Sequence, residues 1–219
     1  MSIRKLIILS GAGDPENPKY MKVYNLIVDY AKRLNYGEII IQNWKGQDSF
    51  MEKGFLNMKD ATNTATHLFM NIEDSGNEYD VICRSFGAGV FLNVCQNLQL
   101  QKIGFASLWG ISTYTAAYEL FKEKIKETIE SSKSKGVAFD ETFFESVIPF
   151  DLLLCRFNQN FRVNIISGAA DIISPPAFNG YLKESIKNEN LHFSSPISGL
   201  LHEVMDYHQE YLERLFSKY

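Results

Sequence analysis

The chain has 219 residues, of which 45% are hydrophobic and 22% are charged, a mixture that is typical of a folded globular domain and does not indicate disorder. Lysine and arginine number 22 against 26 aspartates and glutamates, giving a net charge of -4 with no basic stripe that would favour a nucleic-acid partner. No apolar run approaches the roughly 20 residues needed to span a bilayer. We therefore expect one soluble domain covering residues 1–219, with no nucleic acid bound and no membrane span.

Short apolar runs bounded by glycine or polar residues are typical of strands buried on both faces of a parallel sheet, whereas apolar residues at a period near 3.6 indicate a helix. The two patterns alternate along the chain. In chain order the sequence predicts a strand over 5–9, a helix over 20–34, a strand over 38–42, a helix over 60–74, a strand over 79–83, a helix over 90–98, strands over 102–106 and 162–167, a helix over 176–187, a strand over 191–194 and a closing helix over 203–218.

This alternation predicts the fold class. Parallel neighbouring strands need long crossover connections, so the sequence favours an α/β fold with a mostly parallel central sheet and helices on both faces. Residues 111–156 interrupt the alternation with a charged helical segment, a polar break over 131–136 and a run of phenylalanines. We predict that these residues form a small helical cap inserted into the single domain.

The cysteines and histidines indicate neither a disulfide framework nor a metal site. Cys83, Cys95 and Cys155 are odd in number and far apart, which suits a reducing compartment. The four histidines have no partner at a spacing typical of zinc ligands. We expect a cytoplasmic protein with no metal ion and no cofactor.

One serine lies at a sharp turn between a predicted buried strand and a predicted helix. The segment 79–90 reads YDVICRSFGAGV and places Ser85 at this turn. A nucleophile held on such a strained turn needs small neighbours two residues before and two residues after it. Gly87 meets the second requirement, whereas Cys83 stands at the first. The alternative is that Ser85 only caps the following helix.

An aspartate and a histidine follow the late strands. The segment 162–175 reads RVNIISGAADIISP and places Asp171 just beyond a buried strand, where open α/β sheets assemble their sites; a plain turn-forming aspartate is the alternative. His202 follows the last predicted strand and precedes the closing helix. His208 is the rival base, but we expect it inside the closing helix, packed on the stripe that faces the sheet.

These motifs resemble those of the α/β-hydrolase family, whose nucleophile elbow is followed along the chain by an acid and then a histidine. The resemblance extends from Leu6 to the last helix and lacks the leading antiparallel strands of larger members. It implies that Ser85 is the nucleophile, that His202 is the base and that Asp171 orients this histidine.

The same resemblance implies an oxyanion hole made of two backbone amides. One belongs to Phe86, directly after the nucleophile. The other belongs to Ala12 in the loop after the first strand, although this loop differs from the His-Gly start of many relatives. We expect the substrate to contact Gly11, Trp109 and Phe144.

The sequence therefore predicts a serine hydrolase of the carboxylic ester hydrolase or thioesterase type, which acts on a small-molecule or acyl substrate through an acyl-enzyme. A non-catalytic binding protein of the same fold is one alternative, favoured by Cys83 at a glycine position. A dinucleotide-binding protein is another, with the SGAG turn at 10–13 cradling a phosphate. Its glycine pattern is incomplete, and no acidic residue ends the strand over 38–42.

Overall fold

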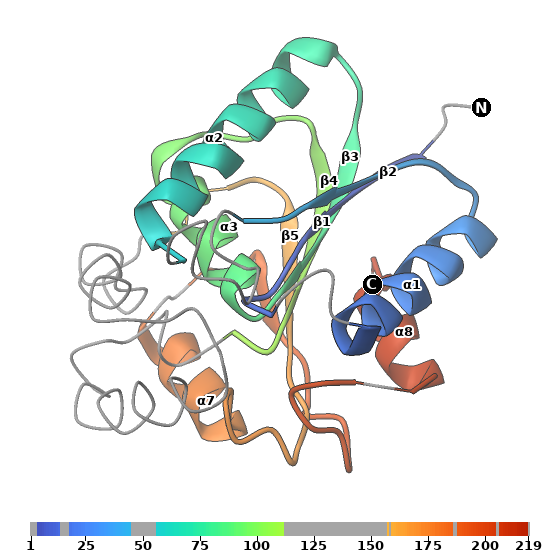
Figure 1. The fold of residues 1–219 in the computed structure, drawn as a ribbon. Helices are drawn as coiled ribbons and strands as arrows, with labels where there is room; N and C mark the ends of the chain where they lie inside the picture. The colour runs from blue at the N-terminus through green and yellow to red at the C-terminus, as the bar shows by residue number, and fades with distance from the viewer. Residues whose placement is uncertain are drawn as a thin grey trace.

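The computed structural model describes residues 4–13, 18–44, 56–111, 157, 159–185, 188–204 and 206–218. Within them, six strands form one sheet in the order β2-β1-β3-β4-β5-β6 (Figure 1). The strands are β1 (Arg4–Leu9), β2 (Tyr36–Gln42), β3 (Tyr79–Arg84), β4 (Ile103–Trp109), β5 (Arg162–Ile166) and β6 (Leu191–Phe193). Each described pair of neighbouring strands is parallel, which confirms the predicted α/β fold class.

Helices cover both faces of this sheet (Figure 1). They are α1 (Pro18–Arg33), α2 (Met58–Ser75), α3 (Phe86–Asn97), α7 (Pro176–Ser185) and α8 (Gln209–Leu215). One apolar cluster joins the sheet to α2, α3 and α7, and a second joins it to α1 and α8. Because successive side chains of a strand point to opposite faces, Val81 and Cys83 enter the first cluster and Ile82 the second.

The strand order changes direction at β1, which pairs with β2 on one side and with β3 on the other. In open α/β sheets, such a switch point leaves a crevice beyond the carboxyl ends of the strands. Ser10 follows β1 and Ser85 follows β3, so the predicted nucleophile and the loop predicted to serve it start from the two strands at this point.

Most element boundaries differ from the prediction by a few residues, and two of the differences bear on the residues around His202. Strand β4 extends to Trp109, three residues past the predicted end at 106, because Leu108 and Trp109 continue the pairing with β5. The closing helix, α8, begins at Gln209 rather than at residue 203. Tertiary contacts hold the segment before it in another conformation, including a hydrogen bond from the Trp109 indole to the His202 carbonyl oxygen (2.9 Å).

The predicted place of His208 is therefore wrong. This residue is the N-cap of α8, with extended backbone angles, and its Nδ1 accepts a hydrogen bond from the Tyr211 amide (3.2 Å). A side chain that satisfies a free amide of the first helical turn stabilises the start of the helix. His208 has a structural role, but at the end of the helix and not within it.

A buried carboxylate with several polar partners lies at the amino end of β3. Asp80 is only 4% exposed and accepts hydrogen bonds from Arg4 (3.0 Å) and the Tyr36 hydroxyl, while Lys218 Nζ lies 3.3 Å from its other oxygen. Burial and then the hydrogen bond to Asp80 raise the pKa of Tyr36 above its usual value. This cluster, Arg4–Tyr36–Asp80–Lys218, joins the first three strands to a residue beyond the last helix.

The predicted cap over 111–156 lies outside the described residues except for Ile111, which is buried. The cap therefore stays a prediction. No helix in the described part of the chain is both long and apolar enough to cross a membrane.

Candidate active site

The backbone at Ser85 has the strained conformation expected of a nucleophile elbow. Its φ is 49° and its ψ is −112°, in a region that residues other than glycine rarely adopt and that recurs at functional sites. The turn is fixed by two backbone hydrogen bonds, from the Ser85 amide to the Trp109 carbonyl (2.8 Å) and from the Ala88 amide to the Ser85 carbonyl (3.1 Å). The Ser85 side chain makes no capping hydrogen bond to α3, so the helix-cap alternative does not explain this serine.

The hydroxyl of Ser85 instead belongs to a chain of three polar groups. Ser85 Oγ lies 2.9 Å from His202 Nε2, and His202 Nδ1 lies 2.9 Å from Asp171 Oδ2. In the neutral tautomer that donates from Nδ1 to the carboxylate, Nε2 is left to accept the serine proton. The structure thus brings together all three residues that the sequence nominated as nucleophile, base and orienting acid.

Asp171 is held so that one oxygen faces the histidine. Its other oxygen, Oδ1, accepts hydrogen bonds from the amides of Ile173 (2.9 Å) and Ser174 (2.7 Å). Asp171 is 2% exposed and His202 is 6% exposed. Amides that bind one carboxylate oxygen fix the other in place, and exclusion of water strengthens its interaction with the imidazole.

Backbone contacts bring the loops that carry the acid and the base side by side. Gly168 and Ile197 form a parallel bridge beyond β5 and β6, and the amides of Ala169 and Ala170 donate to the carbonyls of Ile197 (2.8 Å) and Leu200 (3.0 Å). A Cβ at Gly168 would lie 2.2 Å from the Leu200 carbonyl oxygen. Glycine is therefore what allows the two loops to approach this closely.

A second close approach explains why glycine stands two positions after the nucleophile. A Cβ at Gly87 would lie 2.4 Å from the Ser10 carbonyl oxygen and 2.6 Å from that of Leu9. The first turn of α3 therefore packs directly on the end of β1, as the sequence argument for a small residue two positions after Ser85 required.

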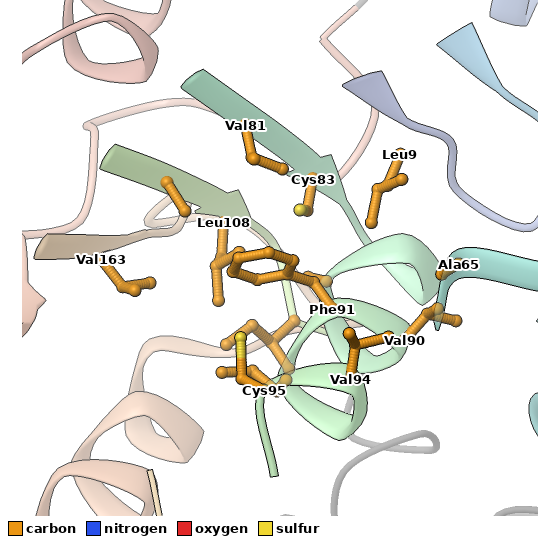
Figure 2. Packing of buried hydrophobic residues seen from close by; sticks show 14 of the residues in the cluster. Leu9, Ala65, Val81, Cys83, Val90, Phe91, Val94, Cys95, Leu108 and Val163 are labelled. Carbon is orange, nitrogen blue, oxygen red and sulfur yellow. The ribbon is translucent and has the colours of Figure 1, made fainter. Parts of the chain in front are cut away.

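Cys83, two positions before the nucleophile, lies in the core. It is fully buried in the cluster between β3 and α3, as Figure 2 shows together with Val81, Leu108 and Phe91. Burial, with a smaller contribution from Cys95, raises the pKa of the Cys83 thiol well above its usual value. A protonated thiol inside an apolar core is not reactive, so the cysteine at this glycine position does not offer a rival nucleophile to Ser85.

Sequence reasoning missed Gly110, which lies against the catalytic candidates. Its φ is 59°, and a Cβ at this position would lie 2.9 Å from Cε1 and Nδ1 of His202 and 3.3 Å from Asp171 Oδ2. The available signal was a glycine just beyond a strand end, but the predicted strand stopped before reaching it.

The structure places Trp109 in the core, against the loop that carries His202. The residue is fully buried, its indole donates to the His202 carbonyl, and its ring packs edge-on against Tyr211 at a centroid distance of 4.7 Å. These contacts support the histidine loop, and the contact of Trp109 with a substrate stays a prediction.

For the other predicted site residues that it describes, the structure gives a position near Ser85 but no contact that assigns a role. The Gly11 amide donates to the Tyr24 hydroxyl (2.8 Å), and a Cβ at Gly11 would lie 3.5 Å from Ser85 Cβ. Ala12 is partly buried, and Phe86 begins α3 directly after the nucleophile. Their oxyanion-hole roles stay a prediction, and Phe144 lies outside the described residues.

A partly buried ion pair flanks the site, and sequence reasoning missed it as well. Arg84 precedes Ser85 and is 2% exposed; its Nη2 lies 3.3 Å from Oε2 of Glu203, which follows His202. Burial lowers the pKa of Arg84, but Tyr211, Tyr24 and Glu203 raise it further, so that its pKa lies above the usual value. The guanidinium stays charged inside the protein.

Within the described ranges, no three His, Cys, Asp or Glu side chains are grouped so that they could hold a metal ion.

Comparison with known proteins rests on structure. No protein-family model and no curated protein sequence matches the chain. Solved structures do. A protein of Agrobacterium vitis S4 assigned as a hydrolase superposes with a TM-score of 0.70 at 14% identity, covering 97% of this chain and 85% of its own. The mouse alpha/beta hydrolase domain-containing protein 10 gives 0.60 at 12% identity, covering 89% and 81%.

A monoacylglycerol lipase from Paleococcus ferrophilus gives a TM-score of 0.56 at 15% identity, covering 91% of this chain and 86% of its own. The structural similarity thus extends over most of each chain, although few residues are identical. Together with the parallel sheet in the order β2-β1-β3-β4-β5-β6, these similarities show that the chain has the α/β-hydrolase fold.

Proposed function

We propose that this protein is a serine hydrolase that cleaves a carboxylic ester or thioester of a small or acyl substrate through an acyl-enzyme. One observation carries the proposal: the unbroken hydrogen-bonded chain from Ser85 Oγ through the His202 imidazole to the Asp171 carboxylate, with both contacts at 2.9 Å. A serine hydroxyl is a weak nucleophile until an adjacent base accepts its proton, and this arrangement supplies that base together with the group that orients it.

The proposed reaction follows from this geometry. His202 Nε2 takes the proton as Ser85 Oγ attacks the carbonyl carbon, while Asp171 stabilises the imidazolium. The tetrahedral intermediate collapses when His202 returns the proton to the leaving alkoxide or thiolate, leaving an acyl group on Ser85. Water, activated by the same histidine, then releases the acid. We assign stabilisation of the oxyanion to the backbone amides of Phe86 and Ala12.

The alternatives are less well supported. A non-catalytic protein of this fold would have no need to hold Ser85 at a strained φ of 49° and within hydrogen-bond distance of a histidine. In a phosphate-binding turn the backbone amides point at the phosphate, whereas the Gly11 amide donates to the Tyr24 hydroxyl. The lipase among the similar structures agrees with an ester substrate.

A fluorophosphonate probe tests the proposal. The wild-type protein should be labelled, and Ser85→Ala should abolish both labelling and hydrolysis of p-nitrophenyl esters. The matched control is Cys95→Ser, because Cys95 lies near the end of α3 that is remote from Ser85. This variant should be labelled like the wild type. Hydrolysis that persists in Ser85→Ala would refute the proposal. A panel of p-nitrophenyl esters and acyl-CoA thioesters of graded chain length then identifies the acyl and leaving groups.

A further inference from the structure

Arg84 immediately precedes the proposed nucleophile, and its charge is almost entirely enclosed by protein, with 2% of the residue exposed. Side chains alternate along a strand, so Arg84 points to the face of the sheet opposite to Cys83, toward Tyr24 of α1 and Tyr211 of α8. Keeping a guanidinium away from water is unfavourable unless a partner of opposite charge and hydrogen bonds compensate for the lost hydration.

The partner is Glu203, at a distance of 3.3 Å between Nη2 and Oε2. Glu203 directly follows His202, the proposed base, and lies 119 residues from Arg84 along the chain. The ion pair therefore joins the residue before the nucleophile to the residue after the base. A movement of the histidine loop away from the serine turn would separate the two charges.

Tyr24 connects this ion pair to a third segment of the site. The Arg84 guanidinium carbon lies 5.6 Å from the centre of the Tyr24 ring, a cation–π distance, and the Tyr24 hydroxyl accepts the hydrogen bond from the Gly11 amide (2.8 Å). Burial raises the pKa of Tyr24, so its hydroxyl stays neutral. The Gly11 loop also carries Ala12, a proposed oxyanion donor.

We propose that Arg84, Glu203 and Tyr24 are positioning residues that hold the serine turn, the histidine loop and the oxyanion loop in one arrangement. The inference rests on the proposed function. Proton transfer and oxyanion stabilisation depend on placement, since a misplacement of about 1 Å can lower the rate about 100-fold. The three residues act through Ser85, His202 and the Gly11 loop and need no contact with substrate.

The amino end of β3 supplies a matched control. The buried carboxylate of Asp80 is paired with Arg4 at 3.0 Å, on the same strand as Arg84 but at the end remote from Ser85. A variant at each end therefore removes one charge of a partly buried ion pair. A purely structural role predicts the same outcome at both ends, whereas positioning predicts a catalytic defect at one end alone.

The experiment measures kcat and KM for p-nitrophenyl butyrate together with the melting temperature. We expect Arg84→Met to lower kcat about 10- to 100-fold with KM changed less than about threefold. Arg84→Lys, which keeps the charge, should recover part of this loss. Asp80→Asn should lower the melting temperature and leave kcat of the folded protein within about twofold of wild type.

The inference is wrong if Arg84→Met leaves kcat within about twofold of wild type, or if it raises KM alone. Should Arg84→Met fail to fold, Tyr24→Phe decides: a several-fold lower kcat at an unchanged melting temperature supports positioning, and an unchanged kcat overturns it. Ser85→Ala separates the two proposals. If it abolishes turnover while Arg84→Met and Tyr24→Phe do not lower kcat, only the positioning role is refuted; turnover that persists in Ser85→Ala refutes the proposed function itself.

Discussion

The two ends of β3 carry buried charges that are arranged in different ways. At the amino end, the Asp80 carboxylate is surrounded by Arg4, Tyr36 and Lys218. At the carboxyl end, a paired Arg84 stands beside a residue with a positive φ and an unbroken hydrogen-bonded chain to two loops. The first arrangement ties strands together. The second holds a strained turn against loops that arrive from distant parts of the chain, which is what a site for chemistry requires.

The largest effect should separate two histidines that lie six positions apart. His202→Ala removes the proposed base and should lower kcat for an ester about 10⁴- to 10⁶-fold without unfolding the protein. His208→Ala removes only the N-cap acceptor of α8 and should lower the free energy of unfolding by about 1 kcal/mol with kcat unchanged. Ester turnover and urea denaturation measure the two quantities. A large loss of kcat in His208→Ala with little loss in His202→Ala would exchange the two roles.

Two glycines with positive φ test whether a side chain lowers kcat only where it would contact the site. Gly110 and Gly76 both have positive φ, 59° and 71°, so alanine should destabilise the fold at either position by about 1–2 kcal/mol. A Cβ at Gly110 would press on the His202 ring, whereas nothing lies within 4 Å of one at Gly76. We expect Gly110→Ala to lower kcat about 100-fold and Gly76→Ala to leave it unchanged. Equal kcat values in the two variants would contradict the packing of Gly110 on the imidazole.

The smallest effect concerns Cys83, which lies next to the site but faces the core. A thiol whose pKa burial raises keeps its proton in the folded protein where the unfolded chain has lost it. Its contribution to stability is therefore complete below about pH 8.5 and decreases as the pH rises toward the folded pKa, by up to about 1.4 kcal/mol per pH unit.

Urea denaturation at about pH 8 and about pH 10 measures this decrease, because those values fall on either side of the usual thiol pKa. The free energy of unfolding should fall more in the wild type than in Cys83→Ala, which has no thiol at this position. An equal fall in both proteins would show that the thiol is accessible to water. Iodoacetamide should then modify Cys83 in the native protein, which we do not expect.

The sequence predicted the parts of the molecule that depend on local pattern. The apolar runs before Ser10 and Ser85 are buried strands, and Ser85, Asp171 and His202 meet because each follows the carboxyl end of a parallel strand, a relation that strand order along the chain already implies. Residues with these roles can be nominated without knowing any distance.

Contacts between distant residues could not be predicted in this way. No periodicity joins Arg84 to Glu203, and the contact of Gly110 with His202 depends on β4 running three residues further than its apolar pattern suggested. The closing helix was predicted too long because the apolar spacing of residues 203–208 is helical, whereas tertiary contacts of the kind that Trp109 makes determine their conformation. Tertiary packing overrides local preference at such positions.

The cluster at the amino end of β3 also bears on the order in which the protein folds. Lys218 follows all six strands along the chain, yet it is one of the cations beside the buried carboxylate of Asp80. Synthesis proceeds from the N-terminus, so the first three strands emerge before this cation is available to them. Strand β3 should therefore lack one of its stabilising charges on the ribosome until α8 docks and brings Lys218 to Asp80. His202 lies just before α8 along the chain, so the same docking step also brings His202 close to Ser85. Assembly of the sheet and assembly of the site would then be completed together.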